Sequence, residues 1–248
     1  FINIQQPDDT YTNPNRSLDF TKSIHYVLSY NATITDNLNF KTELYYQYLY
    51  DVPLRTYQPY TVSPINGLFD EGHLVSKGKG RNYGIEFTLE KYFSSQYYFL
   101  ITASLFESEI ESLDSIFYES RYNTRFAYNI VGGKEFNIGA AKRKLIGVSG
   151  KAIWSGGPRT KPLVNGIPDN IQLFEEQLQD YFRIDFSIYY RINRPKVSHI
   201  ISFDVQNIIN RLNTYNREFN YDSNGNYLGY EDEEQNGILP IFNYRLEF

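Results

Sequence analysis

The last eleven residues, Ile238-Leu-Pro-Ile-Phe-Asn-Tyr-Arg-Leu-Glu-Phe248, alternate between apolar and polar side chains. This period of two predicts a strand with one apolar face, made of Phe242, Tyr244, Leu246 and Phe248. An aromatic stripe on a terminal strand would promote association in water. It suits lipid, because a membrane-spanning strand has about 9–11 residues and alternates apolar outside with polar inside. The stretch therefore predicts a membrane-spanning strand, and Pro240 fits its start.

The bulk composition favours the same interpretation. The 248 residues include 24 Tyr and 18 Phe, so that 17% of the chain is aromatic, while the mean hydropathy is low. This combination is expected when one residue in two faces lipid and the next faces water. No apolar run approaches the ~18 residues of a transmembrane helix, so the sequence excludes that class.

Charge and residue types exclude several functions. A net charge of −5 argues against a general phosphate-binding surface, so nucleic acid is not predicted as a partner. The sequence has no cysteine, which excludes a disulfide framework and a Cys-ligated metal. It contains no Ser-His-Asp arrangement or paired-carboxylate motif. We therefore predict no enzyme and assign no catalytic residue, cofactor or metal.

Eight further segments alternate with period two, which makes nine predicted strands with the C-terminal one. They are residues 24–35, 38–50, 82–90, 99–105, 126–130, 146–154, 182–191 and 201–206. Short turns at 36–37, 94–96, 136–144 and 194–196 alternate with long connections at 51–80, 107–124, 156–180 and 208–237. Membrane barrels have short periplasmic turns and long extracellular loops. The sequence thus predicts an all-β, antiparallel up-and-down transmembrane β-barrel with Phe248 at the periplasmic end.

The strand count also bears on the extent of the chain. Bacterial single-chain barrels have an even number of strands, and the nine predicted strands begin with one that descends from outside. We therefore expect at least one more strand upstream. The sequence opens within a pattern at Phe1, which we interpret as a mature or truncated portion of a longer protein.

Five stretches resemble a known family. They are Asp19-Phe-Thr-Lys-Ser-Ile-His-Tyr-Val-Leu-Ser-Tyr30, Gly80-Arg-Asn-Tyr-Gly-Ile-Glu-Phe-Thr-Leu-Glu-Lys-Tyr-Phe93, Asn123-Thr-Arg-Phe126, Phe203-Asp-Val-Gln-Asn-Ile-Ile-Asn-Arg211 and the terminal Tyr-Arg-Leu-Glu-Phe. In order and spacing they are similar to the C-terminal barrel portion of Bacteroidetes-type TonB-dependent outer-membrane receptors. The resemblance implies that residues 1–248 are roughly strands 14 to 22 of a 22-stranded barrel, without the plug and the N-terminal strands.

The resemblance implies a function, a location and partners. The whole protein would import a scarce ligand, such as an iron chelate, haem, cobalamin or a glycan, across the bacterial outer membrane. Its expected partners are outer-membrane lipid, its own plug and remaining strands, a TonB complex reached through the missing N-terminus, and a surface lipoprotein as a lid. The aromatic end, Phe242, Tyr244, Leu246 and Phe248, resembles the signal that the barrel-assembly machinery recognises.

Aromatic residues in the long connections are the candidate ligand-binding residues. They are Tyr57, Tyr60, Phe69, Tyr118, Phe174, Tyr221 and Tyr227. Their rings could stack on a sugar or a chelate, or they could pack the loops against one another. Asp222 to Asn226, together with Glu233, partly matches a calcium loop, but Tyr227 stands where that loop needs glycine. A type I′ turn at Asn224-Gly225 in an outer hairpin is the preferred interpretation.

Two other functions remain open at this point. A non-energised outer-membrane pore or adhesin would have the same strands and would differ in lacking a plug. A soluble carbohydrate-binding β-domain would bury its apolar faces against one another and would give no reason for the one-sided loop lengths.

Overall fold

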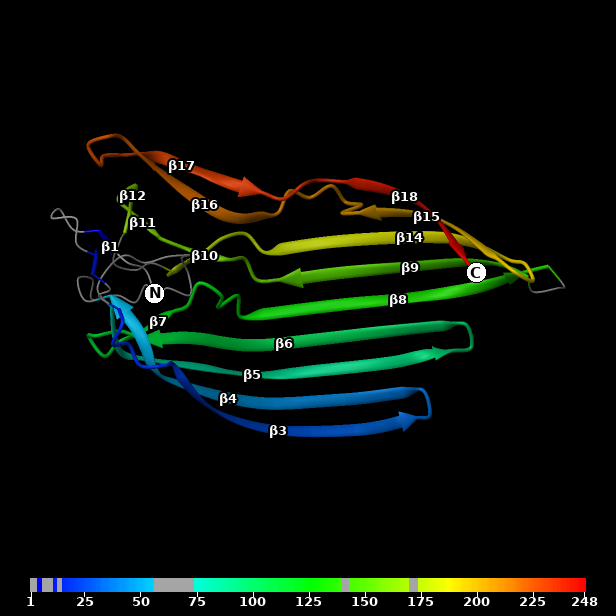
Figure 1. The fold of residues 1–248 in the computed structure, drawn as a ribbon, viewed down its shortest axis with the longest axis horizontal. Helices are drawn as coiled ribbons and strands as arrows, with labels where there is room; N and C mark the ends of the chain where they lie inside the picture. Colours follow the sequence, from blue (N-terminus) through cyan, green and yellow to red (C-terminus); the bar gives the residue numbers. More distant parts are fainter. Residues whose placement is uncertain (1–3, 6–10, 13–14, 56–73, 140–142, 170–173) are drawn as a thin grey trace.

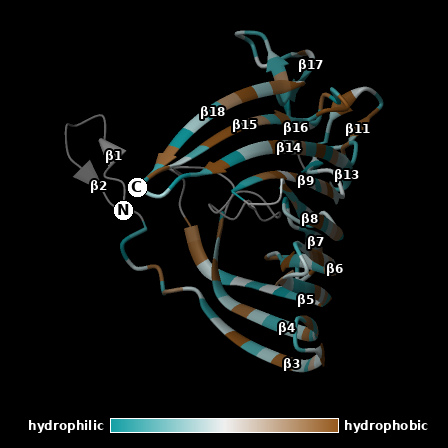
Figure 2. Ribbon diagram, turned by 90° about the vertical axis from the view of Figure 1, so that its right-hand side faces the viewer, coloured by the Kyte–Doolittle hydropathy of each residue, from teal (hydrophilic) through white to brown (hydrophobic). Residues whose placement is uncertain are grey.

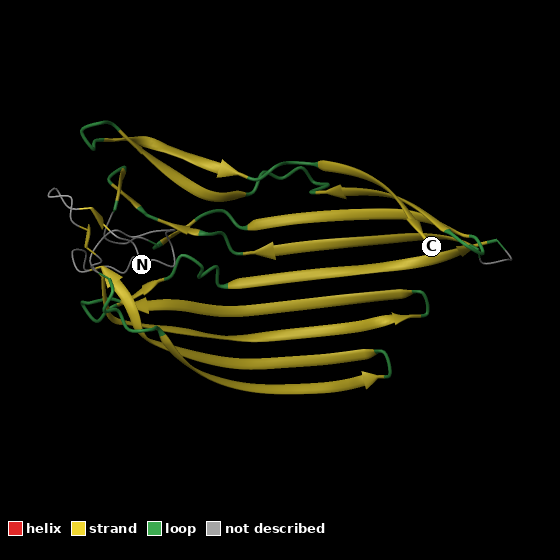
Figure 3. Ribbon diagram, viewed as in Figure 1, coloured by secondary structure: helices red, strands yellow, loops and turns green. Residues whose placement is uncertain are grey.

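The computed structural model describes residues 4–5, 11–12, 15–55, 74–139, 143–169 and 174–248. Tyr57, Tyr60 and Phe69 lie outside these ranges. The described residues contain no helix that is long and apolar enough to cross a membrane. The architecture is all-β, as predicted (Figure 3).

Nine long strands form one antiparallel sheet, in which each strand pairs with its neighbours along the chain in the order β18-β15-β14-β9-β8-β6-β5-β4-β3 (Figure 1). They are β3 (Lys22–Thr35), β4 (Leu38–Arg55), β5 (Leu74–Ser94), β6 (Tyr97–Glu111), β8 (Phe126–Ile138), β9 (Lys144–Ser155), β14 (Tyr181–Asn193), β15 (Ser198–Gln206) and β18 (Leu239–Glu247). The short β7 (Phe117–Glu119) pairs with β6 off this path. All nine predicted strands are confirmed.

The register of the strands places apolar residues opposite apolar residues on neighbouring strands. Leu28 lies opposite Leu44, Leu44 opposite Ile85, and Ile85 opposite Leu105, so one apolar row crosses four strands. Since side chains alternate along a strand, the rows between them are polar. The alternation of hydropathy is visible along the strands of the curved sheet (Figure 2). We call the apolar, convex side the outer face and the polar, concave side the inner face.

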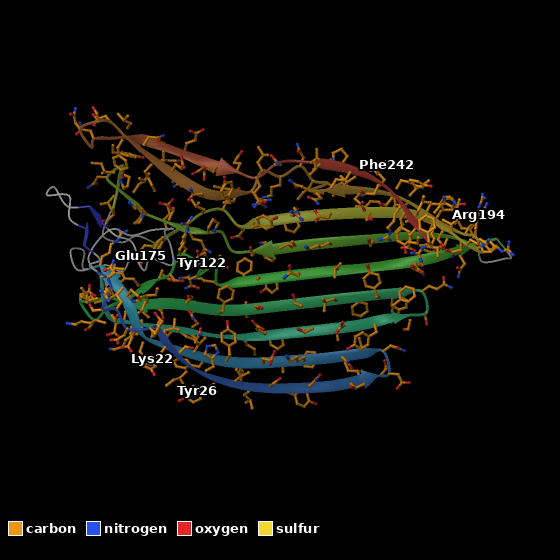
Figure 4. The ribbon with its side chains drawn as sticks, viewed as in Figure 1. Lys22, Tyr26, Tyr122, Glu175, Arg194 and Phe242 are labelled. Carbon is orange, nitrogen blue, oxygen red and sulfur yellow. The ribbon has the colours of Figure 1, made fainter. Side chains whose placement is uncertain are left out.

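The outer face is exposed instead of forming a core. Tyr26 is 63% exposed and Phe242 is 69% exposed, and both project away from the sheet on its two edge strands (Figure 4). The few buried apolar side chains of the described residues include Val52 and Leu54, each 1% exposed. An apolar surface of this extent marks contact with another apolar phase, because soluble monomers rarely expose such patches.

The two ends of the sheet differ as predicted. The tight turns and the C-terminus lie at one end, and the long connections gather at the other (Figure 1). At the predicted turn at 94–96, Ser95 (φ 50°) and Gln96 (φ 67°) both adopt the left-handed conformation between the paired residues Ser94 and Tyr97. Such a two-residue turn matches the twist of the flanking strands.

The predicted connections at 51–80, 107–124 and 136–144 were too long. β4 continues to Arg55 and β5 begins at Leu74, β6 continues to Glu111, and β8 runs to Ile138. These strand ends are rich in glycine and charged residues, so they show no apolar alternation, although their backbone pairing continues. At Gly78 the missing side chain is required, since an added Cβ would lie 2.8 Å from the backbone carbonyl oxygen of Val52.

The long connections contain small strands of their own. β10 (Arg159–Thr160) pairs with β13 (Glu176–Gln177), and β11 (Leu163–Val164) pairs with β12 (Ile167–Pro168). The connection at 208–237 holds the predicted hairpin, formed by β16 (Thr214–Tyr221) and β17 (Tyr227–Glu234). A further small ladder joins β1 (Ile4–Gln5) to β2 (Tyr11–Thr12).

Three inner-face tyrosines each lie over the glycine that faces them on the next strand: Tyr45 over Gly84, Tyr98 over Gly133 and Tyr189 over Gly147. The fit is closest at Gly147, where an added Cβ would lie 2.1 Å from Cε1 of Tyr189. A ring that covers a glycine fills the space left by the missing side chain and fixes the register of the pair.

Candidate ligand-binding site

The connections at the end of the sheet opposite the C-terminus form the candidate site. Figure 4 places Tyr122 and Glu175 in this region and Arg194 at the opposite end. The region combines β7 and the turn before β8, the β10–β13 connection, and the β16–β17 hairpin. Side-chain contacts join these three parts into one cluster.

Arg159 of β10 fastens the middle connection to the sheet. Its side chain is 3% exposed and forms an ion pair with Glu119 at 3.2 Å. Its Nε donates to the carbonyl oxygen of Asn123 at 2.7 Å, and its Nη1 donates to the carbonyl oxygen of Phe174 at 3.0 Å. Burial lowers the pKa of the Arg159 guanidinium, while the carboxylate of Glu119 acts in the opposite direction. A buried arginine with this many partners holds both ends of the connection in place.

Asn123 holds two carboxylates beside this arginine. It is fully buried, and its Nδ2 donates to Glu107 at 2.6 Å and to Glu119. Arg125 adds an ion pair to Glu119 at 3.0 Å and lies 3.8 Å from Glu107. The hydrogen bond to Glu119 raises the pKa of Arg125. This stretch, Asn123 to Phe126, belongs to the family resemblance, and the structure gives Asn123 and Arg125 a structural role.

Arg217 of β16 fastens the hairpin to the middle connection. It forms two hydrogen bonds with Asp232 of β17, at 2.6 and 2.9 Å, and one with Glu176 of β13 at 2.9 Å. Its guanidinium lies 4.0 Å from the centre of the Tyr230 ring. Hydrogen bonding to Arg217 lowers the pKa of Asp232, and the two carboxylates raise the pKa of the arginine.

Of the candidate aromatic residues that the structure describes, two form a pair and two lie apart from that pair. The hydroxyl of Tyr118 in β7 donates to Asp114 at 2.6 Å, and half-buried Phe174 lies beside Arg159. Tyr221 and Tyr227 face each other on the hairpin, with ring centres 5.8 Å apart. The fold thus brings Tyr221 and Tyr227 together and places Tyr118 and Phe174 in other parts of the cluster.

The tip of the hairpin is a tight turn built on Asp222. Its Oδ1 accepts hydrogen bonds from the backbone amides of Asn224 and Asn226, each at 2.8 Å. The Asn226 side chain, whose Nδ2 donates to Oδ2 of Asp222 at 2.8 Å, lowers the pKa of the Asp222 carboxyl most, and the backbone amides lower it further. Within the turn itself Gly225 has a positive φ (81°) and Asn224 does not, so the expected type I′ turn at Asn224-Gly225 was wrong, and a three-residue turn with a left-handed glycine stands in its place.

The calcium alternative finds no support in this geometry. Glu233 accepts from Asn216 at 2.8 Å along the hairpin, while the oxygens of Asp222 are taken by the turn itself. Across the described ranges, the structure brings together no group of three or more side chains that could hold a metal ion.

A polar hollow of about 370 Å³ lies on the inner face at the base of the hairpin. Its lining comes from the ends of β14, β15 and β18 that lie next to the long connections, and from both ends of the hairpin connection. The lining includes Arg183, Gln206, Tyr215, Glu234 and Gln235. Sequence analysis did not group these residues into one site, because no local pattern joins positions that lie so far apart. The one local feature that could have indicated a ligand site here is Tyr215, an aromatic residue in a long connection.

The C-terminal strand lies at the edge of the sheet. Phe242, Tyr244, Leu246 and Phe248 are 69%, 55%, 42% and 100% exposed. β18 pairs only with β15 in the described sheet, so its other edge is open to a further strand.

Comparison of the fold with solved structures identifies outer-membrane receptors. The ferric yersiniabactin uptake receptor FyuA from Yersinia pestis matches 92% of this chain with a TM-score of 0.65 and 16% sequence identity. The ferripyoverdine receptor of the outer membrane of Pseudomonas aeruginosa matches 99% with a TM-score of 0.60 and 17% identity. The ferric-catecholate import receptor Fiu from Escherichia coli matches 92% with a TM-score of 0.55 and 14% identity.

These likenesses define the fold. The nine-stranded sheet is the fold of part of the barrel wall of such receptors. The chain spans about 30% of the length of the FyuA and ferripyoverdine receptor chains. No protein-family model and no curated protein matches the sequence.

Proposed function

We propose that residues 1–248 form the C-terminal part of the barrel of a TonB-dependent outer-membrane receptor of the Bacteroidetes type, which imports a scarce ligand. In this proposal the chain supplies barrel wall and outer loops. The receptor's own plug and remaining strands, outer-membrane lipid and a TonB complex are its partners. The solved receptors with this fold support the proposal at the level of architecture.

The observation that carries the proposal is the continuous apolar outer face. Leu44, Ile101, Ile130, Phe203 and Phe242, on five different strands, are all between 37% and 69% exposed. Such a surface is stable in lipid, where the backbone polar groups must pair within the sheet. The soluble alternative would require a second layer over this face, and the described residues form none.

The side chains of the outer face change character toward the loops. Tyr46 stacks on Tyr83 at 6.3 Å, and in the next position along β5 on the same face Arg81 pairs with Glu109 at 2.5 Å. Aromatic rings gather where a bilayer meets water, and ion pairs belong in the water beyond them. We therefore place the outer boundary of the membrane between Tyr83 and Arg81.

The roles of the site residues follow from the same proposal. Tyr221 and Tyr227, on a hairpin above this boundary, would contact ligand, while Tyr118 and Phe174 would stabilise the loop cluster. Phe242, Tyr244, Leu246 and Phe248 would form the signal for the barrel-assembly machinery. A surface lipoprotein would cover the loops.

The lipid contact can be tested with single cysteines, since this chain has none. Phe203→Cys lies on the outer face and Ser202→Cys, the matched control, lies on the inner face of β15. In the full-length protein in lipid vesicles, a fluorophore on Phe203→Cys should be quenched by spin-labelled lipid, and one on Ser202→Cys should not. Equal quenching at both positions, or at neither, would contradict the membrane orientation.

A second measurement separates an importer from an open pore. An importer whose barrel is closed by a plug should give no steady conductance in a planar bilayer, whereas an unplugged barrel should conduct. Ligand uptake that persists in cells without a functional TonB complex would likewise rule out energised import.

A further inference from the structure

We infer that the hollow at the base of the β16–β17 hairpin is a binding site for a neutral saccharide. The inference rests on the proposed function, because it takes the inner face of the barrel as the path of the ligand. It names the class of ligand and the residues that would select it.

The hollow offers hydrogen-bonding groups that are not used elsewhere. Within the part of the chain that the structure describes, the side chains of Gln206, Gln235, Glu234 and Tyr215 have no hydrogen-bond or ion-pair partner. Each carboxamide both donates and accepts, and the carboxylate accepts. Sugar hydroxyls also donate and accept, so this mixed set matches several of them on one ring.

Tyr215 supplies an apolar surface among these polar groups. Its side chain is 48% exposed, and the ring takes part in no described aromatic pair. A saccharide ring has an apolar C–H face as well as hydroxyls, and ligand sites usually combine an aromatic surface with a few placed polar groups. A volume of about 370 Å³ is at the small end of ligand sites and suits one or two sugar units.

The walls of the hollow are fixed before any ligand binds. Asn207 is 2% exposed, and its Nδ2 donates to the carbonyl oxygens of Arg211 at 2.8 Å and Asn236 at 3.3 Å. Its backbone amide donates to Asp185 at 2.9 Å. Arg211 in turn donates to the carbonyl oxygen of Asp180 at 2.7 Å. This network joins the ends of β14 and β15 to the hairpin connection, so that little ordering is needed on binding.

Charge at this site favours a neutral ligand over an anionic one. The guanidinium of Arg183 is paired with Asp185 at 2.7 Å, while the carboxylate of Glu234 has no cation beside it. Residues 214–234 contain six acidic residues and a single arginine. An anionic chelate would therefore meet like charge at this mouth of the barrel, and a neutral polyhydroxylated ligand would not.

The test uses the full-length protein in an amine-oxide detergent, because detergents with sugar head groups would compete. Maltose, cellobiose and lactose serve as neutral probes, and glucuronic acid as the anionic probe, with binding measured by saturation-transfer NMR and calorimetry. At least one neutral disaccharide should bind more tightly than glucuronic acid. Tyr215→Ala and Gln235→Leu should each weaken that binding by about tenfold, since tenfold corresponds to the loss of one or two polar or stacking contacts.

Matched variants outside the hollow serve as controls. Tyr122→Ala removes an aromatic residue that is 58% exposed in the turn before β8, and Asn220→Ala removes an exposed amide on the hairpin. Neither should change saccharide binding. The inference is overturned when none of the three disaccharides binds, when glucuronic acid binds best, or when the variants in the hollow bind like the controls.

Failure here is distinguishable from failure of the proposed function. Quenching at Phe203→Cys without saccharide binding would leave the outer-membrane receptor intact and remove only the ligand assignment. A loss of folding in Tyr215→Ala is detected by its unfolding midpoint, and Tyr215→Phe, which keeps the ring, should then retain saccharide binding.

Discussion

A side chain at Gly147 should be destabilising, because the ring of Tyr189 on the neighbouring strand occupies the space above it. A Cβ at position 147 would lie 2.1 Å from Cε1, 2.2 Å from Cζ and 2.6 Å from Oη of Tyr189. The Gly147→Ala substitution must therefore displace the ring and break the hydrogen bond from the Tyr189 hydroxyl to Glu135. Overpacking and the lost hydrogen bond together should reduce the free energy of unfolding by about 2–4 kcal/mol.

A control lies three residues further along the same strand, on the outer face. At Gly150 an added Cβ would meet only the carbonyl oxygen of Asp185, at 3.6 Å, which is an ordinary contact. Gly150→Ala should therefore change the free energy of unfolding by less than about 0.5 kcal/mol. Both glycines have an ordinary backbone conformation for a strand, but Gly147 lies on the inner face and Gly150 on the outer face, so the effect of the ring is isolated by repeating the substitution in the absence of the Tyr189 ring.

The assay is a urea titration of the full-length protein in detergent micelles, with folded protein recognised by its faster migration in unheated gels. A double-mutant cycle with Tyr189→Ala completes it, since removal of the ring should make Gly147→Ala nearly neutral. Equal costs for Gly147→Ala and Gly150→Ala, or a Gly147→Ala cost that persists without the Tyr189 ring, would refute the packing argument.

Three further predictions concern the outer face and the loop cluster. Phe186→Arg, on the outer face at mid-strand, should cost about 2–4 kcal/mol in the same titration, whereas Ser187→Arg on the inner face should be nearly neutral; equal tolerance would contradict the lipid orientation. Arg159→Leu removes the buried cation beside Glu119 and the donors to the carbonyl oxygens of Asn123 and Phe174, so it should increase protease cleavage of the β10–β13 connection several-fold, and an unchanged cleavage rate would exclude this role. Because Arg217 lowers the pKa of Asp232, their contact should stabilise the hairpin above the ordinary aspartate pKa of about 3.9 and be lost as pH falls through the lower folded value. Asp232→Asn should remove this acid transition from a cleavage assay of the hairpin, and its persistence would assign the transition to another group.

Much of the fold could be predicted because its signal is local. Residues 24–35 and 182–191 alternate strictly, and alternation alone identifies a strand and its two faces. The turn at Ser94 to Gln96 and the hairpin between Phe219 and Tyr227 were found from their turn-forming residues.

The errors occurred where alternation stops but backbone pairing continues. The residues from Leu74 to Gly80 are mostly glycine or polar, so they were assigned to a loop, yet they pair with β4 and, at Lys79 and Gly80, with β6. Strand pairing depends on hydrogen bonds from the backbone, which the side-chain pattern does not report. The turn type at Asn224-Gly225 was wrong for a similar reason, since Asp222 binds its own backbone and selects a different turn.

The sequence by itself determined the strand pattern, the apolar outer face and the one-sided loop lengths, because each depends on neighbours within a few residues. Only the tertiary structure decided which distant side chains meet. Arg159 forms an ion pair with Glu119, and Arg217 forms one with Glu176. Tyr215 lines the same hollow as Gln206 and Gln235. Most of these partners are tens of residues apart in the chain, and they come together only because nine paired strands carry their connections to the same end of the sheet.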